Sequence, residues 1–298
     1  MHSVTEQIYL RLARWLDSSE FCQRLVSRLL IHSPVVEGKI YPFTDSEEAW
    51  WADRGPVVPE SARPDEYPVP PRELWERYGT EPREYLETGE RHTADMLKIL
   101  GTAGFSLEKS ERILDFGCSA GRMIRWLIPF AKEREIWGLD VASKPVHWAM
   151  LNLAPPLHFA VNTTVPHLPF DGESFDMAYC GSVFTHISDL ADVWFLELRR
   201  ILKRGGYLYA TIHDRHTVDL LFGRDSEYRV AKALQTLDVK IGMRRMNYAK
   251  FVFARSPKNT QVYYDLEWLR AHWGRWMELV SVTEEAYGFQ TALVFRKQ

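Results

Sequence analysis

Short apolar runs alternate with segments of helical periodicity over the last two thirds of the chain, and this alternation restricts the fold more than any other feature. We interpret the apolar runs as strands and the periodic segments as helices. The predicted strands cover residues 112–116, 135–140, 157–161, 175–180 and 206–212. The predicted helices between them cover about 121–131, 144–152 and 189–203. Strands and helices in this order form a mostly parallel α/β sheet with helices on both faces.

Two further apolar runs, 276–286 and 289–296, flank Gly288 near the C-terminus. Their short separation predicts an antiparallel hairpin. Five parallel strands and this hairpin give a doubly wound sheet of seven strands. The pair Gly205-Gly206 predicts the end of the helix over 189–203, because glycine tolerates the left-handed conformation of a helix cap.

We expect two parts in the chain: an N-terminal helical extension with a proline-rich linker over residues 1–75, and the main domain over 76–298. Residues 4–31 have apolar side chains at helical spacing with arginines between them. They form either an amphipathic helix on a membrane surface or, as the interleaved acids favour, a helical hairpin. The hairpin would pack on the main domain or on a second subunit, which allows a homodimer. The prolines between residues 54 and 71 exclude a helix interior or a central strand.

Residues 214–275, between the last parallel strand and the hairpin, form an insertion with basic and aromatic residues. Such a mixture is typical of a nucleic-acid-binding surface. The alternative is a solvated helical insertion that closes over a substrate. The net charge of −3 favours this alternative, because it gives the chain no overall attraction for nucleic acid.

The composition argues against several classes of protein. The three cysteines lie far apart and include no Cys-x-x-Cys pair, which disfavours a structural zinc site or a disulfide framework. No cluster of His, Asp and Glu indicates a metal site. The N-terminus lacks the residue order of a signal peptide, and no stretch approaches the roughly 18 apolar residues of a membrane span. We therefore expect a cytoplasmic protein.

The segment Ile113-Leu114-Asp115-Phe116-Gly117-Cys118-Ser119-Ala120-Gly121-Arg122 combines a strand end, an acid and a glycine-rich turn. Such a turn offers free backbone N–H groups, and its glycines let a ligand approach the main chain. The next strand ends on a second acid, Asp140, which is placed to accept hydrogen bonds from both hydroxyls of a ribose. The pattern predicts a nucleoside-cofactor site. The alternative is that Gly117 and Gly121 only shape the turn.

The spacing of the glycines argues against a dinucleotide, whose fingerprint would need glycines where Ser119 and Arg122 stand. Asp115 also serves a pyrophosphate poorly, whereas it suits a cationic ligand such as S-adenosylmethionine. The pattern Asp115-x-Gly117-x-x-x-Gly121 followed by Asp140 resembles the class I S-adenosylmethionine-dependent methyltransferases, whose fold is Rossmann-like.

Three more segments resemble this family in their order and spacing: Leu168–Asp176 before the fourth strand, Ser182–Ile187 after it, and Leu198–Gly206 before the fifth. The run from Val161 to His186 also resembles a bacterial subgroup that acts on sugars or small metabolites. The family often has a third glycine where Ser119 stands in this chain.

The resemblance implies that Asp115, Gly117 and the backbone of Cys118 hold the methionine end of S-adenosylmethionine, with Gly121 in the same turn. It implies that Ser182 lies near the sulfonium.

At the nucleoside end, the resemblance implies that Asp140 binds the ribose and that Val141 packs on the adenine. Asn162 would bond the adenine amino group. Tyr85 would cover the cofactor, with plain core packing as the alternative.

His186 and His213 both follow strand ends on the ligand side, so either would serve as the general base for a hydroxyl acceptor. Asp214 would orient His213. The alternative is that both histidines pack within the fold. We expect methyl transfer to a small molecule, with a hydroxyl of a sugar, glycoconjugate or metabolite as acceptor. The rival functions are an NAD-dependent oxidoreductase of related fold and a non-catalytic S-adenosylmethionine-binding or scaffold protein.

Overall fold

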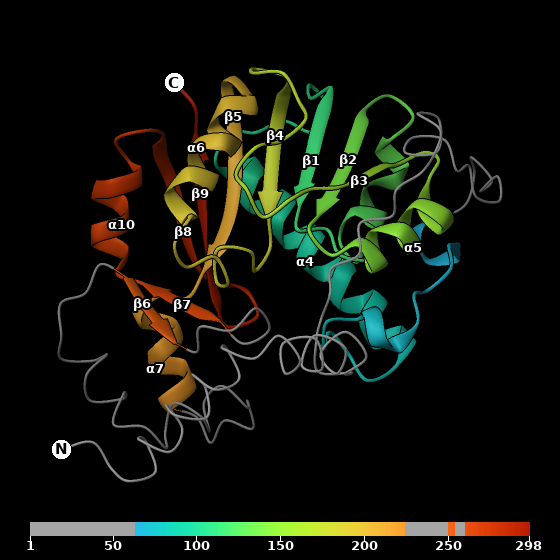
Figure 1. Ribbon diagram of the computed structural model, residues 1–298, viewed down its shortest axis with the longest axis horizontal. Helices are drawn as coiled ribbons and strands as arrows, with labels where there is room; N and C mark the ends of the chain where they lie inside the picture. Colours follow the sequence, from blue (N-terminus) through green and yellow to red (C-terminus); the bar gives the residue numbers. More distant parts are fainter. Residues whose placement is uncertain (1–62, 224–249, 254–259) are drawn as a thin grey trace, which may run out of the picture. The chain divides into compact units, whose positions relative to one another are not determined.

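A seven-stranded sheet with the order β3-β2-β1-β4-β5-β9-β8 forms the centre of the protein (Figure 1). The computed structural model describes residues 63–223, 250–253 and 260–298. The strands of the sheet are β1 (Arg112–Phe116), β2 (Glu135–Asp140), β3 (His158–Val161), β4 (Phe175–Cys180), β5 (Leu202–Ile212), β8 (Glu278–Tyr287) and β9 (Gln290–Arg296). The predicted helices over residues 4–31 lie outside the described residues.

The first five strands pair in parallel, and β9 lies antiparallel between β5 and β8. The prediction of a doubly wound, mostly parallel sheet with a C-terminal antiparallel hairpin is confirmed. The chain leaves β1 toward β2 on one side and leaves β4 toward β5 on the other, so the topology switches between β1 and β4. Sheets of this kind bind ligands at the carboxyl ends of the strands beside such a switch.

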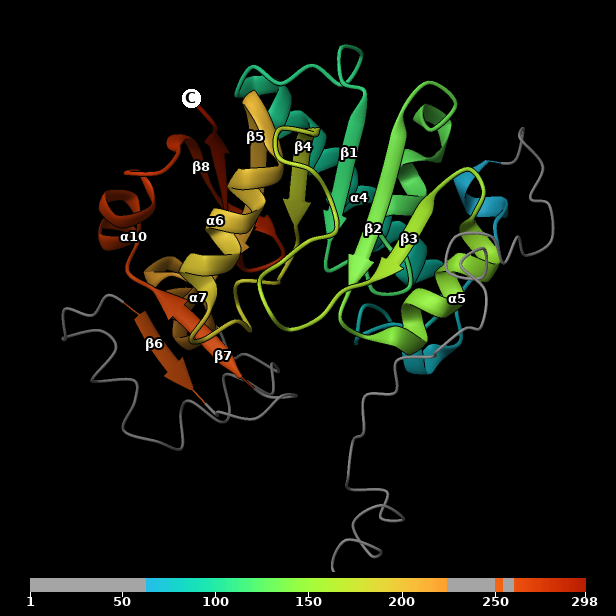
Figure 2. The same ribbon diagram turned by 45° about the horizontal axis from the view of Figure 1, so that its top comes forward.

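Helices cover both faces of the sheet and bury two separate apolar cores (Figure 2). The helices are α4 (Pro82–Thr102), α5 (Ser143–Leu153), α6 (Ala191–Ile201), α7 (Arg215–Gly223) and α10 (Leu266–Trp273), with 3₁₀ turns η1 (Pro64–Glu66), η2 (Arg72–Leu74) and η3 (Ile124–Phe130). Alternate residues of a strand point to opposite faces. Accordingly, Ile113 packs with α4 and α5, and Leu114 packs with α6 and α10.

The segment after the glycine loop is not the α-helix that its periodicity predicts over 121–131. It contains turns and then the 3₁₀ helix η3, within which Pro129 lies. Proline has no backbone N–H and its ring clashes with the preceding turn of an α-helix, so the i→i−4 pattern does not continue through it.

The prediction that Gly205-Gly206 caps a helix is wrong. Helix α6 ends at Ile201, and β5 begins at Leu202. Gly205 has a φ of 81°, and the pairing with β4 shifts its register between Phe175 and Met177. The glycines therefore form an irregularity inside the strand. This placement extends β5 beyond the predicted range of 206–212.

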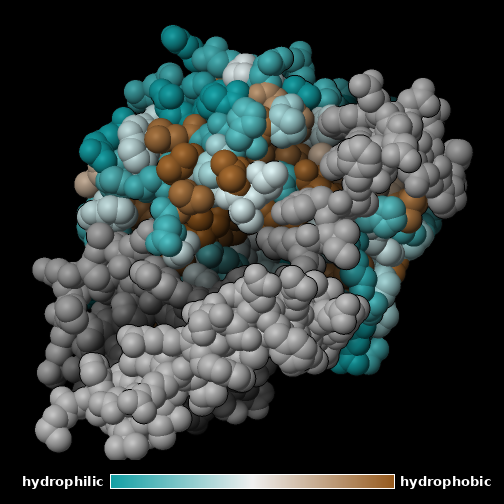
Figure 3. All heavy atoms as spheres, in the orientation of Figure 1, coloured by the Kyte–Doolittle hydropathy of each residue, from teal (hydrophilic) through white to brown (hydrophobic). Residues whose placement is uncertain are grey.

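A loop, without any helix, connects β3 to β4 across residues 162–174. Leu168 is fully buried in this loop, and its backbone N–H donates to the Glu197 carboxylate of α6 at 2.6 Å. Beside the loop, α6 leaves Val193 and Leu196 exposed, and apolar residues gather over this helix in Figure 3.

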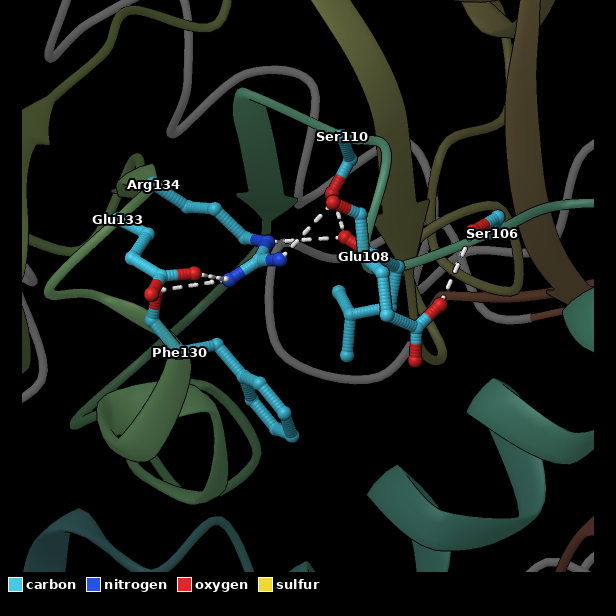
Figure 4. A network of polar contacts seen from close by, with 7 residues as sticks. Ser106, Glu108, Ser110, Phe130, Glu133 and Arg134 are labelled. Atoms are coloured by element: carbon cyan, nitrogen blue, oxygen red, sulfur yellow. Dashed lines mark hydrogen bonds and ion pairs between the residues drawn. The ribbon is translucent and has the colours of Figure 1, made fainter.

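At the amino ends of the strands, Arg134 connects the segment that precedes β1 to the segment that precedes β2 (Figure 4). Its guanidinium donates to the carbonyls of Leu107 at 2.8 Å, Glu108 at 3.1 Å and Phe130 at 3.4 Å. Three backbone acceptors satisfy much of the fork of donors on an arginine. The amino ends of the two strands are therefore fixed away from the site.

The described residues 260–273 of the expected insertion are only partly solvated. Strand β7 (Gln261–Tyr264) pairs with β6 (Lys250–Phe253), and Tyr263, Tyr264 and Trp273 are fully buried. Their aromatic side chains complete the core beside α6, while the outer face of α10 stays exposed at Glu267 and Arg270. Most of the basic residues in the insertion lie outside the described residues.

We expect Trp273→Ala to lower the free energy of unfolding by about 3–5 kcal/mol, the usual cost of emptying a large aromatic site in a core. Trp273 stacks on Phe195 with ring centroids 4.5 Å apart and also contacts Phe184 and Phe295. Urea unfolding measures the loss. Val193→Ala on the exposed face of α6 is the control and should change stability by less than about 0.5 kcal/mol. A loss below about 1 kcal/mol for Trp273→Ala would contradict its place in the core.

Candidate active site

Asp115 lies at the topological switch, where β1 and β4 are neighbours. It is the register partner of Tyr179, whose hydroxyl donates to the Asp115 carboxylate at 2.9 Å. Asp115 is only 4% exposed. Burial raises the pKa of Asp115 to about 7, the Tyr179 hydrogen bond and Arg122 act to lower it, and Asp140 raises it further. A cation bound beside Asp115 would favour its ionised form.

The glycine loop packs closely against its surroundings. A Cβ on Gly117, which has a φ of 89°, would lie 2.3 Å from Cγ2 of Val183. A Cβ on Gly121, with a φ of 80°, would lie 2.5 Å from Cδ1 of Leu153 in α5. Both glycines therefore have a packing role, whatever they do for a ligand.

The expectation of free backbone N–H groups in this loop is wrong for four of its residues. The N–H groups of Gly117 and Cys118 both donate to the carbonyl of Leu139, and that of Gly121 donates to the carbonyl of Cys118. The N–H of Ser119 donates to the Asp140 carboxylate at 2.9 Å. The loop turns its donors toward the protein because the end of β2 lies directly beside it. Such a loop is poorly equipped to hold a phosphate, which needs free donors.

Asp140 fixes the loop from the end of β2. Its Oδ2 accepts from Ser119, and its Oδ1 accepts from the backbone N–H of Ala142 at 2.8 Å. A carboxylate oxygen accepts more than one hydrogen bond. The backbone N–H of Asn162 donates to the Asp140 carbonyl at 3.0 Å, which brings the ends of β2 and β3 together.

The other expected cofactor residues lie at the same edge of the sheet. Val141 directly follows Asp140 and is half-buried. Asn162 is 4% exposed, and its Oδ1 is buried without a partner among the described residues. Ser182 follows β4 in the left-handed region, with a φ of 61°. Tyr85 is 1% exposed and stacks on Trp75 with ring centroids 5.4 Å apart, so little of its surface remains for a ligand.

Residues 114–210 match the family model described as a methyltransferase domain. The matched span holds Asp115, the glycine loop, Asp140 and Ser182. This part of the chain is a methyltransferase domain. The predictions of this enzyme class and of S-adenosylmethionine as its cofactor are therefore confirmed.

Solved structures also resemble the chain at low identity. A SAM-dependent methyltransferase from Methanosarcina mazei is 19% identical over 67% of this chain and 96% of its own, with a TM-score of 0.46. An S-adenosylmethionine-dependent methyltransferase from Clostridium acetobutylicum is 13% identical over 70% and 91%, with a TM-score of 0.48. The 1,6-didemethyltoxoflavin-N1-methyltransferase of Burkholderia thailandensis, solved with S-adenosylhomocysteine, is 14% identical over 70% and 78%, with a TM-score of 0.46.

The two candidate bases, His186 and His213, differ in their surroundings. His186 is exposed, and its Nδ1 lies 2.7 Å from the carbonyl of Thr260. That carbonyl only accepts, so Nδ1 carries the proton and Nε2 is left as an acceptor. Protein atoms around part of the ring displace water from it and lower the pKa of His186, although one face stays exposed, and the Thr260 hydrogen bond opposes this effect.

His213 is buried, and neither of its ring nitrogens has a hydrogen-bond partner in the described part of the chain. Burial lowers the pKa of His213 to about 3. Asp214 does not orient it, which corrects the prediction, because Asp214 Oδ1 accepts instead from the backbone N–H of Thr217 at 3.0 Å. That bond caps the start of α7, as a side chain of this type commonly does.

The structure also places residues next to the site that the sequence patterns did not identify. Gln290 Nε2 donates to Ser182 Oγ at 2.8 Å, and Gln290 Oε1 accepts from Thr211 Oγ1 at 2.6 Å. Tyr287 and Arg122 meet through a hydrogen bond from the guanidinium to the phenol. Gln290 and Tyr287 lie in the C-terminal hairpin, more than a hundred residues from the loop. No local spacing relates them to the site.

The described residues offer neither a metal-binding cluster nor a membrane-spanning helix. Among them, no group of three or more His, Cys, Asp or Glu side chains is arranged to hold a metal ion. None of the described helices combines the length and the apolar character that crossing a membrane requires.

We expect cofactor affinity to fall about tenfold when the pH is lowered from 8 to 6, because Asp115 loses its charge as the pH falls through its pKa of about 7. Isothermal titration with S-adenosylmethionine measures the effect. Asp115→Asn should remove most of this pH dependence and should bind weakly at pH 8. The exposed residue Asp171 gives the control, since Asp171→Asn should keep the dependence. Equal wild-type affinities at pH 6 and 8 would contradict the role of the Asp115 charge.

We expect Ser119→Gly to raise the free energy of unfolding by up to about 1 kcal/mol. Ser119 has a φ of 48°, and a left-handed residue with a Cβ costs about 1–2 kcal/mol, partly offset by the greater chain entropy of glycine. Chemical unfolding measures the change. Ser106→Gly, at a residue outside the left-handed region, is the control and should destabilise. If Ser119→Gly destabilises as well, Ser119 is not strained.

Proposed function

We propose that this methyltransferase transfers the methyl group of S-adenosylmethionine to a hydroxyl of a small molecule, such as a sugar, a glycoconjugate or another metabolite. The observation that carries this proposal is the geometry of His186. Its Nδ1 is bound to the Thr260 carbonyl, which leaves Nε2 as a proton acceptor. The side chain is exposed and follows the carboxyl end of β4. A hydroxyl acceptor needs a base of this kind, whereas a neutral amine does not need one before it attacks.

The residues at the strand ends fit the proposed cofactor. Asp115 supplies a buried negative charge for the ammonium of the methionine end, and the turn at Gly117 and Cys118 forms the adjoining wall. Gly121 holds that turn against α5, and Ser182, beyond the end of β4, lies on the proposed sulfonium side.

For the nucleoside end, Asp140 offers carboxylate oxygens to the ribose, and Val141 offers an apolar surface to the adenine. The unpartnered Oδ1 of Asn162 is suited to the adenine amino group, because that group donates hydrogen bonds. Tyr85 contributes less than expected as a cover, because its ring stacks on Trp75 in the core.

Bound S-adenosylmethionine supplies a methyl group on a sulfonium that leaves as a neutral thioether. The protein therefore aligns the acceptor and excludes water, and it does not have to activate the leaving group. His186 takes the hydroxyl proton at Nε2 as the acceptor oxygen attacks. His213 is less suited to this step, because a base whose pKa is about 3 holds a proton poorly at neutral pH.

Two rival functions remain as outcomes of the test. A nicotinamide-dependent oxidoreductase is less well supported, because the loop turns its N–H groups inward and places Asp115 where a pyrophosphate would lie. A non-catalytic binding protein would bind S-adenosylmethionine without turnover. The proposed homodimer through residues 4–31, the cytoplasmic location and the exclusion of nucleic acid rest on the sequence alone.

We expect His186→Ala to lower kcat by about 10²–10⁴-fold, the usual contribution of a general base, with cofactor affinity changed less than about twofold. Transfer of labelled methyl groups to panels of hydroxyl and amine acceptors measures turnover, and titration calorimetry measures affinity. In the wild type, kcat at saturating cofactor should fall on acidification through a pKa below the usual range for histidine.

The exposed residue His147 of α5 provides the matched control, and His147→Ala should leave kcat unchanged. Equal losses of turnover and affinity in His186→Ala would indicate a packing role. Methylation of amines only would overturn the hydroxyl acceptor, and binding without turnover on any acceptor would favour the non-catalytic rival. Binding of NAD(H) without S-adenosylmethionine would overturn the proposed function as a whole.

A further inference from the structure

Ser182 adopts a backbone conformation that is costly for a residue with a side chain. It comes two residues after the end of β4 and has a φ of 61°, in the left-handed region where a Cβ crowds the following carbonyl. Gly181 before it is tightly packed, because an added Cβ there would lie 2.9 Å from the ring of Tyr287. Strained residues persist only where the surrounding structure holds them, and they cluster at functional sites. The contacts that hold Ser182 therefore bear on the function of this edge of the sheet.

Each polar group of Ser182 has a partner. Its backbone N–H donates to Oγ1 of Thr211 at 2.7 Å, and its carbonyl accepts from Oγ1 of Thr185 at 2.8 Å. Its Oγ accepts from Nε2 of Gln290 at 2.8 Å and lies 3.0 Å from Oγ1 of Thr185. Thr211 belongs to β5 and Gln290 to β9, so tertiary contacts impose the conformation of Ser182.

Gln290 joins two of these groups. Its Oε1 accepts from Oγ1 of Thr211 at 2.6 Å, which closes a ring of hydrogen bonds through Gln290, Ser182 and Thr211. Because the Thr211 hydroxyl accepts from Ser182, its own proton goes to Gln290, and the amide nitrogen is left for Ser182. Gln290 is 5% exposed and Thr211 is fully buried. Hydrogen bonds in such a dry setting are strong, and water does not replace one that is lost.

Ser182 begins a compact turn that leads to His186. The Thr185 hydroxyl bonds to the Ser182 carbonyl, and the backbone N–H of His186 donates to the carbonyl of Val183 at 2.9 Å. Contacts between residues three apart leave such a turn few alternative shapes. The direction in which the chain leaves Ser182 therefore sets the place of His186.

A different segment holds the far end of this turn. The backbone N–H of Val262 donates to the carbonyl of Thr185 at 2.8 Å, and Nδ1 of His186 lies 2.7 Å from the carbonyl of Thr260. The turn is thus attached to the C-terminal hairpin at one end and to the start of β7 at the other. Both attachments are needed to fix its direction, since contacts at one end alone let it pivot.

We propose that Gln290 is a positioning residue whose amide holds Ser182 in the left-handed conformation and thereby places Nε2 of His186 for proton removal. This inference rests on the proposed role of His186 as the base. Gln290 acts through Ser182 and not on the acceptor, so its effect is on alignment, to which transfer rates are sensitive at the scale of an ångström. The neighbouring Thr291 offers a contrast, because it is fully buried in the same strand but its Oγ1 has no partner among the described residues.

The tautomer of His186 gives a first test that needs no methyl acceptor. NMR of the protein labelled with ¹⁵N-histidine, at a pH where the ring is neutral, should show the proton on Nδ1 in the wild type, and His186→Ala assigns the signal. We expect Gln290→Met, which keeps the volume and removes both hydrogen bonds, to give a mixture of tautomers as His186 loses its alignment with Thr260. Adding Ser182→Gly should restore the single tautomer, since glycine adopts the left-handed conformation without strain.

The second test compares kcat, measured by transfer of labelled methyl groups to methyl glycosides and glycerol, with the Kd for S-adenosylhomocysteine from titration calorimetry. We expect Gln290→Met to lower kcat by about 10–100-fold and to change the Kd less than about threefold, as for a misplaced catalytic group. Adding Ser182→Gly should raise kcat again by about fivefold or more, the rate equivalent of the relieved strain. Thr291→Val is the matched control and should change neither quantity.

If Gln290→Met does not fold, Gln290→Asn carries both tests, because its shorter amide does not span Ser182 and Thr211. A single tautomer in Gln290→Met, equal losses of kcat and cofactor affinity, or no recovery with Ser182→Gly would overturn the positioning role. An equally large loss of kcat in Thr291→Val would overturn it as well, since β9 would then support the site only in general. If His186→Ala turns over like the wild type, the proposed base is wrong and the inference fails with it. A loss in His186→Ala beside an unaffected Gln290→Met would contradict the inference alone.

Discussion

The divergence of the chain at the carboxyl ends of β1 and β4 is the constraint on which the rest of the site depends. The two strands are hydrogen-bonded neighbours, yet their connections leave toward opposite edges of the sheet. Asp115 and Tyr179 are therefore register partners between two strands whose following segments lead away from each other. The resulting contact buries a carboxyl group at the strand end, and burial gives it a pKa near neutrality.

The loop after β1 is stabilised from within, which sets it apart from a phosphate-binding loop. Its N–H groups bond to the Leu139 carbonyl, the Cys118 carbonyl and the Asp140 carboxylate. With those donors occupied, the local electrostatics come from the side chains of Asp115, Asp140 and Arg122. This arrangement favours a ligand that carries its own positive charge, and it explains why a cationic nucleoside fits better than a dinucleotide.

The other side of the site is built by segments from far along the chain. Strand β9 enters antiparallel beside β5 and brings Gln290 against Ser182 and Thr211. Thr260, just before β7, meets His186 and fixes the proton on Nδ1. The chemistry proposed for His186 thus depends on a residue in the segment that the sequence presented only as an insertion.

The sequence by itself determined the sheet, its strand ends and the acids placed there, because a strand's alternation and the acid after it are local properties of a few residues. It did not determine the form of the segment after the glycine loop, where Pro129 prevents the α-helix that the periodicity of Met123 and Leu127 indicates. It also did not relate Arg122 to Tyr287 or His186 to Thr260. Only the tertiary structure decided those contacts, because they join residues whose separation along the chain carries no periodic signal and whose pairing arises from how the strands and helices pack.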